Sequence, residues 1–231
     1  MSINSFPGIA AVVPAAGVGK RMQADKPKQY LRLLGKTILE HSVSPLLLLP
    51  VVKQLYLALS PDDPYFGATS LNSSPLIRVD GGTERVNSVL NALLQIDAEE
   101  MPWVLVHDAA RPLVRIEDIT LLIEHCLAAG HGGILATPVR DTMKRGKTLV
   151  SMTVERNDLW HALTPQFFPT ALLRQCITAA LAAGVTITDE ASAMEWAGEP
   201  VLLVEGRSDN LKITRPADLT LAAFYLEQNQ K

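Results

Sequence analysis

Short apolar runs that alternate with longer amphipathic segments constrain the fold of this chain more than any other feature of its sequence. The apolar runs are Ile9–Val13, Gln54–Ser60, Leu76–Val79, Trp103–His107 and Gly133–Pro138. Nearly continuous apolar runs of this length are typical of strands that helices cover on both faces. The 3.6-residue spacing of helices occurs between them, at Thr37–Leu49, Glu84–Ile96 and Ile116–Ala129. The alternation predicts an α/β fold with right-handed crossovers and a doubly wound, mostly parallel sheet.

The alternation stops between about Val139 and Glu155. A charged turn, Lys144-Arg145-Gly146-Lys147, lies there between Thr142-Met143 and Val150–Val154, two runs that can pair as a hairpin. An isolated two-stranded hairpin is marginal in water, so this one needs another surface to pack on. The remainder predicts helices and one strand (Val201–Glu205), the helices being Thr170–Ala183, Asp189–Ala197 and Pro216–Glu227. We therefore expect a single domain over residues 1–231 that carries an arm at about residues 139–156.

The loop after the first predicted strand has the composition of a phosphate-binding loop. Pro14-Ala15-Ala16-Gly17 leads through Gly19 into a stretch, Lys20 to Arg32, that holds five basic side chains and one acidic one. Small residues let backbone N–H groups approach a ligand, and basic side chains neutralise phosphate charge. A lone basic cluster is more often a solvated surface, but its position at the end of a strand favours a ligand site.

Two familiar phosphate loops are excluded here. The Walker pattern requires Gly where Pro14 stands, and Ser or Thr where Arg21 follows Lys20. The dinucleotide pattern G-x-G-x-x-G fails because Met22 occupies its third glycine position. The sequence therefore predicts a different nucleotide loop, in which arginine and lysine side chains supply the charge.

Composition excludes several classes of protein. Apolar residues make up 48% and charged residues 19% of the 231-residue chain, which is typical of a folded domain and not of a disordered one. The net charge of −3 argues against non-specific binding of nucleic acid. No apolar run approaches the roughly 20 residues that span a membrane, and Met1 to Pro7 lacks the regions of a signal peptide. Cys126 and Cys176 lie far apart without a C-x-x-C pattern, which favours two buried thiols in a cytoplasmic protein.

For the other candidate residues, the sequence alone allows either a structural or a functional role. Asp108 and Arg111 follow a strongly apolar strand, where they form either a structural salt bridge or a site for substrate hydroxyls or Mg²⁺. Gly81-Gly82 either makes a tight turn with Thr83 as N-cap of the next helix or brings backbone groups to a ligand. Thr188 and Asp189 either cap a short helix or contact substrate. No cluster of His, Glu or Cys predicts a permanent transition-metal site.

Six motifs that recur in order give the chain a wider resemblance. After the loop and Lys26-Pro27-Lys28-Gln29-Tyr30 come His107-Asp108-Ala109-Ala110-Arg111-Pro112, Pro138-Val139-Arg140-Asp141-Thr142-Met143-Lys144, Leu163-Thr164-Pro165-Gln166, Thr188-Asp189-Glu190-Ala191-Ser192 and Asn210-Leu211-Lys212-Ile213-Thr214. From about residue 8 to about residue 226 the chain resembles the 2-C-methyl-D-erythritol 4-phosphate cytidylyltransferases of the sugar nucleotidyltransferase superfamily. The resemblance implies a Rossmann-like nucleotidyltransferase fold, a homodimer formed through the arm, and transfer of CMP from CTP to a sugar-alcohol phosphate with Mg²⁺ as cofactor. It also implies a place in the non-mevalonate route to isoprenoid precursors.

The resemblance assigns roles residue by residue. Arg21 and Lys28 stabilise the α-phosphate in the transition state, while Arg156 and Lys212 complete the catalytic set. Nucleotide-binding positions are Pro14, Ala15, Ala16, Gly17, Gly19, Gly82, Ser88, Asp108 and Ala109. Positions for the second substrate are Asp108, Arg111, Thr142, Arg156, Thr164, Thr188 and Lys212, of which Thr142 and Arg156 serve the neighbouring subunit's site. For Mg²⁺ no cluster of protein ligands is predicted, and Asp108 is the one candidate position.

Two alternatives stay open at this point. The ribitol 5-phosphate cytidylyltransferases share the early motifs and differ in the acceptor, although Arg140-Asp141-Thr142-Met143-Lys144 and Thr164-Pro165-Gln166 favour the erythritol enzymes. A nucleotide sensor that keeps the fold without turnover is the second, and the joint presence of Arg21, Lys28, Asp108, Arg156 and Lys212 argues against it.

Overall fold

The computed structural model describes residues 6–17, 22 and 25–229. Its strands are β1 Ile9–Pro14, β2 Arg32–Leu33, β3 Lys36–Thr37, β4 Val52–Leu59, β5 Ile77–Asp80, β6 Trp103–Val106, β7 Gly133–Pro138, β8 Met143–Gly146, β9 Val150–Val154, β10 Trp160–Pro169 and β11 Leu202–Glu205. Its α-helices are α1 Ile38–Leu47, α2 Arg85–Leu93, α3 Ile116–Ala129, α4 Thr170–Ala182, α5 Glu190–Trp196 and α6 Pro216–Asn229. Gly19 and Arg21, both predicted site residues, lie outside the described part of the chain.

Among the described residues, a seven-stranded sheet in the order β11-β7-β10-β6-β1-β4-β5 forms the centre of the molecule. The pairs β1–β4, β1–β6, β4–β5 and β7–β11 are parallel, whereas β10 runs antiparallel to both of its neighbours. The predicted mostly parallel sheet is therefore confirmed.

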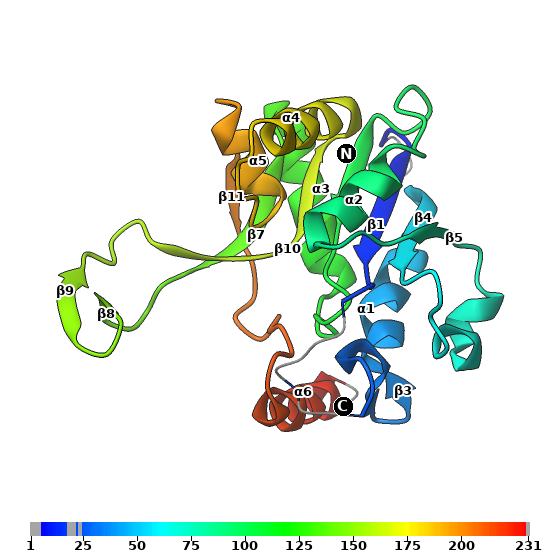
Figure 1. Cartoon of the computed structure of the whole chain (residues 1–231), viewed down its shortest axis with the longest axis horizontal. Helices are drawn as coiled ribbons and strands as arrows, with labels where there is room; N and C mark the ends of the chain where they lie inside the picture. The colour runs from blue at the N-terminus through cyan, green and yellow to red at the C-terminus, as the bar shows by residue number, and fades with distance from the viewer. Residues whose placement is uncertain (1–5, 18–21, 23–24, 230–231) are drawn as a thin grey trace.

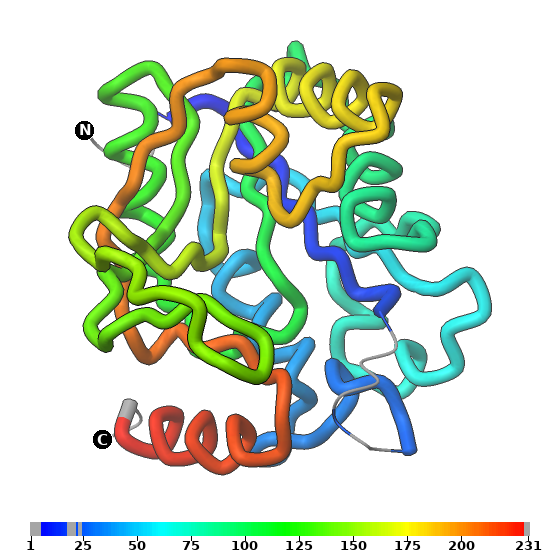
Figure 2. The backbone as a smooth tube through the Cα atoms, turned by 60° about the vertical axis from the view of Figure 1, so that its left-hand side comes forward, coloured from blue at the N-terminus to red at the C-terminus, as the bar shows by residue number. Residues whose placement is uncertain are grey.

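Helices cover both faces of this sheet, as the apolar runs predicted (Figure 1). Alternate residues of β1 point to opposite faces: Ala11 packs with α1 and α3, and Val12 packs with α2, α4 and α5. A third, smaller cluster lies beneath α6, where Ala222 contacts Leu33 and Ile213. Figure 2 shows α6 at the opposite end of the molecule from α4, which leaves the carboxyl ends of β1 and β6 between them.

Strand β10 was not predicted, and it changes the centre of the sheet. Its sequence contains Pro165 and Pro169, which read as breakers because proline cannot donate to a ladder. The structure accommodates Pro165 where the register with β7 shifts, between Ala162 and Gln166. Burial between β6 and β7 supplies the stabilisation that local sequence does not.

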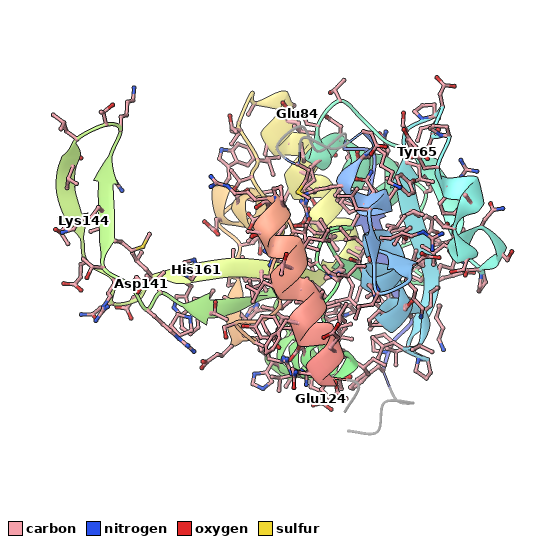
Figure 3. All side chains as sticks on the ribbon, turned by 90° about the horizontal axis from the view of Figure 1, so that it is seen from below. Tyr65, Glu84, Glu124, Asp141, Lys144 and His161 are labelled. Atoms are coloured by element: carbon pink, nitrogen blue, oxygen red, sulfur yellow. The ribbon has the colours of Figure 1, made fainter. Side chains whose placement is uncertain are left out.

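The predicted arm projects from the body as a hairpin of β8 and β9 (Figures 1 and 3). Met143 pairs with Val154, and the exposed turn faces away from the sheet. Three apolar side chains on the arm are largely exposed: Leu149 by 84%, Val150 by 65% and Met152 by 52%. The described part of this chain provides little core for them, so the arm's own packing does not explain its shape.

No helix in the described residues is long and apolar enough to cross a membrane.

Candidate active site

A cleft of about 470 Å³ opens at the carboxyl ends of the central parallel strands. It is lined by the loop after β1, the turn after β5 and the loop after β6, together with two lysines from other segments. The lining comprises Pro14, Ala15, Ala16, Gly17, Lys28, Gln29, Gly82, Thr83, Glu84, Arg85, Ser88, Asp108, Ala109, Ala110 and Lys212. Every predicted nucleotide-binding residue in the described part of the chain therefore lies at this cleft.

Gln29 braces the loop after β1. Its Nε2 donates to the carbonyl oxygens of Ala15 (2.6 Å) and Gly17 (3.1 Å), and the Ala15 N–H donates to Ala58 (2.8 Å). Because the Gln29 side chain is buried, these bonds hold the loop backbone in one position. Gln29 lies in the Lys26-Pro27-Lys28-Gln29-Tyr30 motif, but the sequence predicted no role for it.

The turn after β5 depends on two glycines. A Cβ added to Gly81 would lie 2.2 Å from the Cβ of Ala16, and one added to Gly82 would lie 2.2 Å from the Cβ of Asn87. This close approach lets the Gly82 N–H donate to Ser88 Oγ at 3.0 Å. The turn thus brings backbone into the cleft, where no larger residue would fit.

The predicted N-cap role of Thr83 is wrong. Helix α2 begins one residue later, with Glu84 at the N-cap, and the Glu84 N–H donates to Asn87 Oδ1 at 3.1 Å. Thr83 instead donates through its hydroxyl to the same amide oxygen at 3.1 Å. The Asn87 side chain, itself within α2, therefore accepts the hydrogen bond from the N-cap N–H at the start of this helix. At α5 the capping interpretation is confirmed, because Asp189 Oδ1 accepts from the Ser192 N–H at 3.0 Å.

Asp108 is the electrostatic centre of the cleft. Its Oδ1 accepts from Arg85 Nε at 2.8 Å, while its Oδ2 lies 2.7 Å from Lys212 Nζ and 3.8 Å from Arg111 Nε. Burial raises the pKa of this carboxyl, but the charge of Arg85, followed by that of Lys212, lowers it well below the ordinary value. The Asp108–Arg111 salt bridge is present, and Asp108 is an ionised side chain at a ligand-sized cleft.

His107 and Thr164 connect β6 to β10 beneath this carboxylate. His107 Nε2 lies 3.1 Å from the Arg111 carbonyl oxygen, and because that oxygen only accepts, Nε2 carries the proton. Nδ1 then accepts from Thr164 Oγ1 at 3.1 Å, and Thr164 Oγ1 accepts from the Asp108 N–H at 3.0 Å. Complete burial lowers the pKa of His107 to about 4, so the ring is neutral. The Thr164 proton is therefore committed to His107, which leaves only an oxygen lone pair for a substrate.

A second buried carboxylate holds Arg85. Glu190 Oε1 and Oε2 accept from Arg85 Nη1 and Nη2 at 2.7 and 3.0 Å, and Glu190 is 1% exposed. Gln166 ties the same helix to β10: its Nε2 donates to Asp189 at 2.9 Å and its Oε1 accepts from the Ala191 N–H at 2.9 Å. The sequence predicted no role for Arg85, Glu190 or Gln166, although Glu190 and Gln166 each lie in a quoted motif.

A smaller pocket of about 260 Å³ adjoins the cleft. It shares Arg85, Asp108 and Lys212 with the cleft, so these three side chains form a partition between the two cavities. The remaining lining residues are Arg111, Ala162, Leu163, Thr164, Gln166, Thr188 and Asp189. Five residues predicted for the second substrate from the body of the chain are thus brought together here: Asp108, Arg111, Thr164, Thr188 and Lys212.

The catalytic set is only partly assembled in one chain. Lys28 Nζ donates to the Ile213 carbonyl oxygen at 2.7 Å, which places Lys28 beside the residue that follows Lys212. Thr142 and Arg156 are exposed, and they lie at the two ends of the arm, where Arg156 Nη1 donates to the Arg140 carbonyl oxygen. They contribute to neither cavity.

Asp108 is also the group best suited to a divalent cation at the cleft. The described residues contain no group of three or more His, Cys, Asp or Glu side chains that could hold a metal ion. A single ionised carboxylate beside a phosphate site nevertheless fits Mg²⁺, which commonly takes one or two carboxylates and completes its shell with substrate phosphates and water.

Comparisons with known proteins agree on one family. A model of the 2-C-methyl-D-erythritol 4-phosphate cytidylyltransferase family matches residues 9–228. The chain is 58% identical to the enzyme of that name from Vibrio cholerae over 227 residues, which cover 96% of this chain and 98% of the relative. It is 54% identical to the Pseudoalteromonas translucida enzyme over 229 residues, covering 99% and 95%. Its fold matches the solved structure of the Francisella tularensis enzyme with a TM-score of 0.81 at 35% identity, covering 94% of this chain and 99% of that one.

Proposed function

The chain belongs to the 2-C-methyl-D-erythritol 4-phosphate cytidylyltransferase family, and we propose that its larger cleft holds CTP with the triphosphate beside Lys28. The enzyme transfers CMP from CTP to 2-C-methyl-D-erythritol 4-phosphate and releases pyrophosphate, in the non-mevalonate route to isoprenoid precursors. The observation that carries the proposal is the convergence of the glycine turn, two lysines and an ionised aspartate on one cleft.

Recognition of the nucleotide falls to backbone groups in this proposal. The cytosine lies against the backbone of Ala16 and Gly82 and the hydroxyl of Ser88, and the ribose lies against Asp108 and Ala109. Because Gly81 and Gly82 have no Cβ, the turn packs directly against Ala16 and Asn87, which sets its main chain at the cleft wall that the base would contact. A backbone carbonyl can accept from the amino group of cytosine, which uracil lacks.

Charge stabilisation drives the chemical step. A phosphate oxygen of the acceptor attacks the α-phosphorus of CTP, the bond from that phosphorus to the bridging oxygen breaks, and pyrophosphate leaves with the electron pair. No covalent enzyme intermediate is needed, because the acceptor phosphate is already an anionic nucleophile. Lys28 neutralises charge on the α-phosphate oxygens, and Lys212 orients the attacking phosphate, because fixed cations stabilise phosphoryl transfer more than a proton shuttle does. Arg21 joins Lys28 in this role.

Mg²⁺ is the proposed cofactor, and the Asp108 carboxylate would hold it at the cleft. When bound, it neutralises phosphate charge and favours departure of pyrophosphate. The support for Asp108 is its position at the cleft and its pKa, which burial raises but the charges of Arg85 and Lys212 lower well below the ordinary value.

The acceptor site is proposed to be shared between two chains of a homodimer. The smaller pocket supplies Arg111, Thr164, Thr188 and Lys212 from one chain, and the arm of the second supplies Thr142 and Arg156. The exposed apolar side chains of the arm support this assembly, because a partner's surface would cover them. The two free buried thiols suit a reducing compartment, and we propose that the enzyme acts in the cytoplasm.

Acceptor identity is testable in one experiment. The enzyme is incubated with CTP, Mg²⁺ and an equal mixture of 2-C-methyl-D-erythritol 4-phosphate and ribitol 5-phosphate, and cytidylylated products are identified by mass spectrometry. We expect the erythritol product and acceptor-dependent release of pyrophosphate. A dominant ribitol product would contradict the acceptor assignment, and CTP binding without turnover of either compound would indicate a nucleotide sensor.

A further inference from the structure

We propose that Arg85 and Glu190 are positioning residues that hold the Asp108 carboxylate in place when Lys212 leaves it for substrate phosphate. The inference rests on the proposed role of Asp108 in nucleotide binding. It concerns a pair of side chains that are 105 positions apart in sequence and joined by two hydrogen bonds.

The guanidinium of Arg85 is hydrogen-bonded to two carboxylates, one on each of two edges. Nη1 and Nη2 form a paired contact with the two oxygens of Glu190, and Nε donates to Asp108 Oδ1. A planar fork bound to two carboxylates in this way has one orientation. Three of the five N–H donors of Arg85 are therefore committed to carboxylates, and the side chain passes the position of Glu190 on to Asp108.

The two cations that bind Asp108, Lys212 and Arg85, differ in how firmly they are held. Lys212 binds Oδ2 with a side chain that is 37% exposed on a flexible stem, whereas the Arg85 side chain is 26% exposed and fixed by a carboxylate that is almost fully buried. A substrate phosphate can draw Lys212 away more readily than Arg85. Asp108 then stays ionised and oriented, because Arg85 remains on Oδ1.

The Arg85–Glu190 pair lies between the two cavities. Arg85 opens α2 on the nucleotide side, and Glu190 opens α5 beside the smaller pocket. Arg85, Asp108 and Lys212 form the partition, so the geometry of one wall depends on contacts made to the helix on the other side. A small displacement of a positioning contact can cost on the order of 100-fold in rate.

The test compares Arg85→Lys and Glu190→Gln with two matched controls in the full-length enzyme. Arg174→Lys changes a half-buried arginine on α4 that donates to the Leu93 carbonyl oxygen, and Glu40→Gln changes a buried carboxylate that accepts from Ser70. We expect both site variants to lower kcat/KM for CTP by about 10-fold or more at a temperature well below their Tm. The controls should stay within about two-fold of the parent, whatever their effect on Tm.

Coupling to Asp108 separates positioning from direct binding. We expect Asp108→Asn to lower kcat/KM for CTP strongly, and Arg85→Lys to add less than about two-fold in that background, because its effect passes through the missing carboxylate. Should Glu190→Gln fail to fold, the double variant Arg85→Gln with Glu190→Gln replaces the ion pair by two amides and tests the same point.

The outcomes are distinguishable. A silent Asp108→Asn would contradict the proposed nucleotide site, and the positioning role with it. A damaging Asp108→Asn with parental activity in the Arg85 and Glu190 variants would overturn the positioning role alone. Full additivity of Arg85→Lys with Asp108→Asn would also overturn it, since Arg85 would then act on the substrate directly.

Discussion

The cleft edge, meaning Asp108 and the side chains bonded to it, and the arm at residues 139–156 hold their functional side chains in opposite ways. At the cleft edge, Asp108 is 6% exposed and Glu190 is 1% exposed, and hydrogen bonds from several elements fix them. On the arm, Leu149 is 84% exposed, and Arg156 lies on a segment whose pairing ends at Val154. A network that one chain completes sets its own geometry, whereas the arm packs little against the described part of its own chain, and we propose that a second chain's surface covers it. Nucleotide binding should therefore belong to one chain, and acceptor binding to two.

Replacing Lys28 tests the cleft edge most severely. We expect Lys28→Ala to lower kcat by on the order of 100-fold or more, because a fixed cation at the α-phosphate is lost. The Tm should stay nearly unchanged, since the residue is only partly buried. Steady-state kinetics and a thermal melt of the same preparation measure both quantities.

The matched control for Lys28 comes from the arm. Lys147→Ala removes an equal charge from the exposed turn between β8 and β9, and it should leave kcat within about two-fold. If Lys28→Ala behaves like Lys147→Ala, the cleft edge does not carry the transition-state charge.

Base selection sharpens the comparison next. The ratio of kcat/KM for CTP to that for UTP should be roughly 10 to 100, because an unmatched buried polar group costs about 1–3 kcal/mol. Leu149→Ala on the arm should leave this ratio unchanged even where it lowers both values. Equal use of CTP and UTP would show that the glycine turn does not read the base.

Acid sensitivity should also come from the cleft edge. Burial lowers the pKa of His107 to about 4 from an ordinary value near 6.5. As pH falls below 6.5, His107 becomes protonated in the unfolded chain while it stays neutral in the folded chain. The contribution of His107 to the free energy of unfolding is therefore complete above pH 6.5 and is lost toward pH 4. The free energy of unfolding should fall by roughly 2 kcal/mol between pH 7 and pH 5.

Two variants assign that loss to one residue. His107→Gln should flatten the pH dependence, whereas His161→Gln, at the exposed base of the arm (Figure 3), should retain it. Denaturant titrations at pH 7, 6 and 5 measure the three slopes. An unchanged slope in His107→Gln would contradict the buried neutral ring.

Subunit exchange gives the smallest expected effect, about a quarter of parental activity. Lys28→Ala and Arg156→Ala homodimers should each be nearly inactive. After exchange between equal amounts, about half the dimers are mixed, and in trans each mixed dimer has one site with both lesions and one with neither. Activity should then return to roughly one quarter of the parent. A mixture that verifiably exchanges subunits and stays inactive would mean that both residues serve the same chain's site.

The sequence predicted the strands and helices whose formation depends on the pattern of neighbouring residues. The apolar runs of β1, β4, β5, β6 and β7 and the amphipathic helices lie where expected, and Gly130 ends α3 in the left-handed conformation. Strand β10 was missed because its prolines oppose a strand and its stability comes from burial between two neighbours. The pairing of Arg85 with Glu190 was missed for the same physical reason: it exists only after α2 and α5 are packed on the sheet.

The way the arm leaves the sheet makes the length of the arm independent of the strand pairing of the sheet. The arm departs after Pro138 at the end of β7 and returns at Trp160 at the start of β10, and these two residues are direct ladder partners. The Val139 N–H also donates to the Leu159 carbonyl oxygen at 2.9 Å, which closes the base. Residues 140–158 are thus an insertion at a point where a short turn would already join the strands. A change in the length or sequence of this module would alter the proposed contact with a second chain and the acceptor residues Thr142 and Arg156, while the ladder of the sheet is kept.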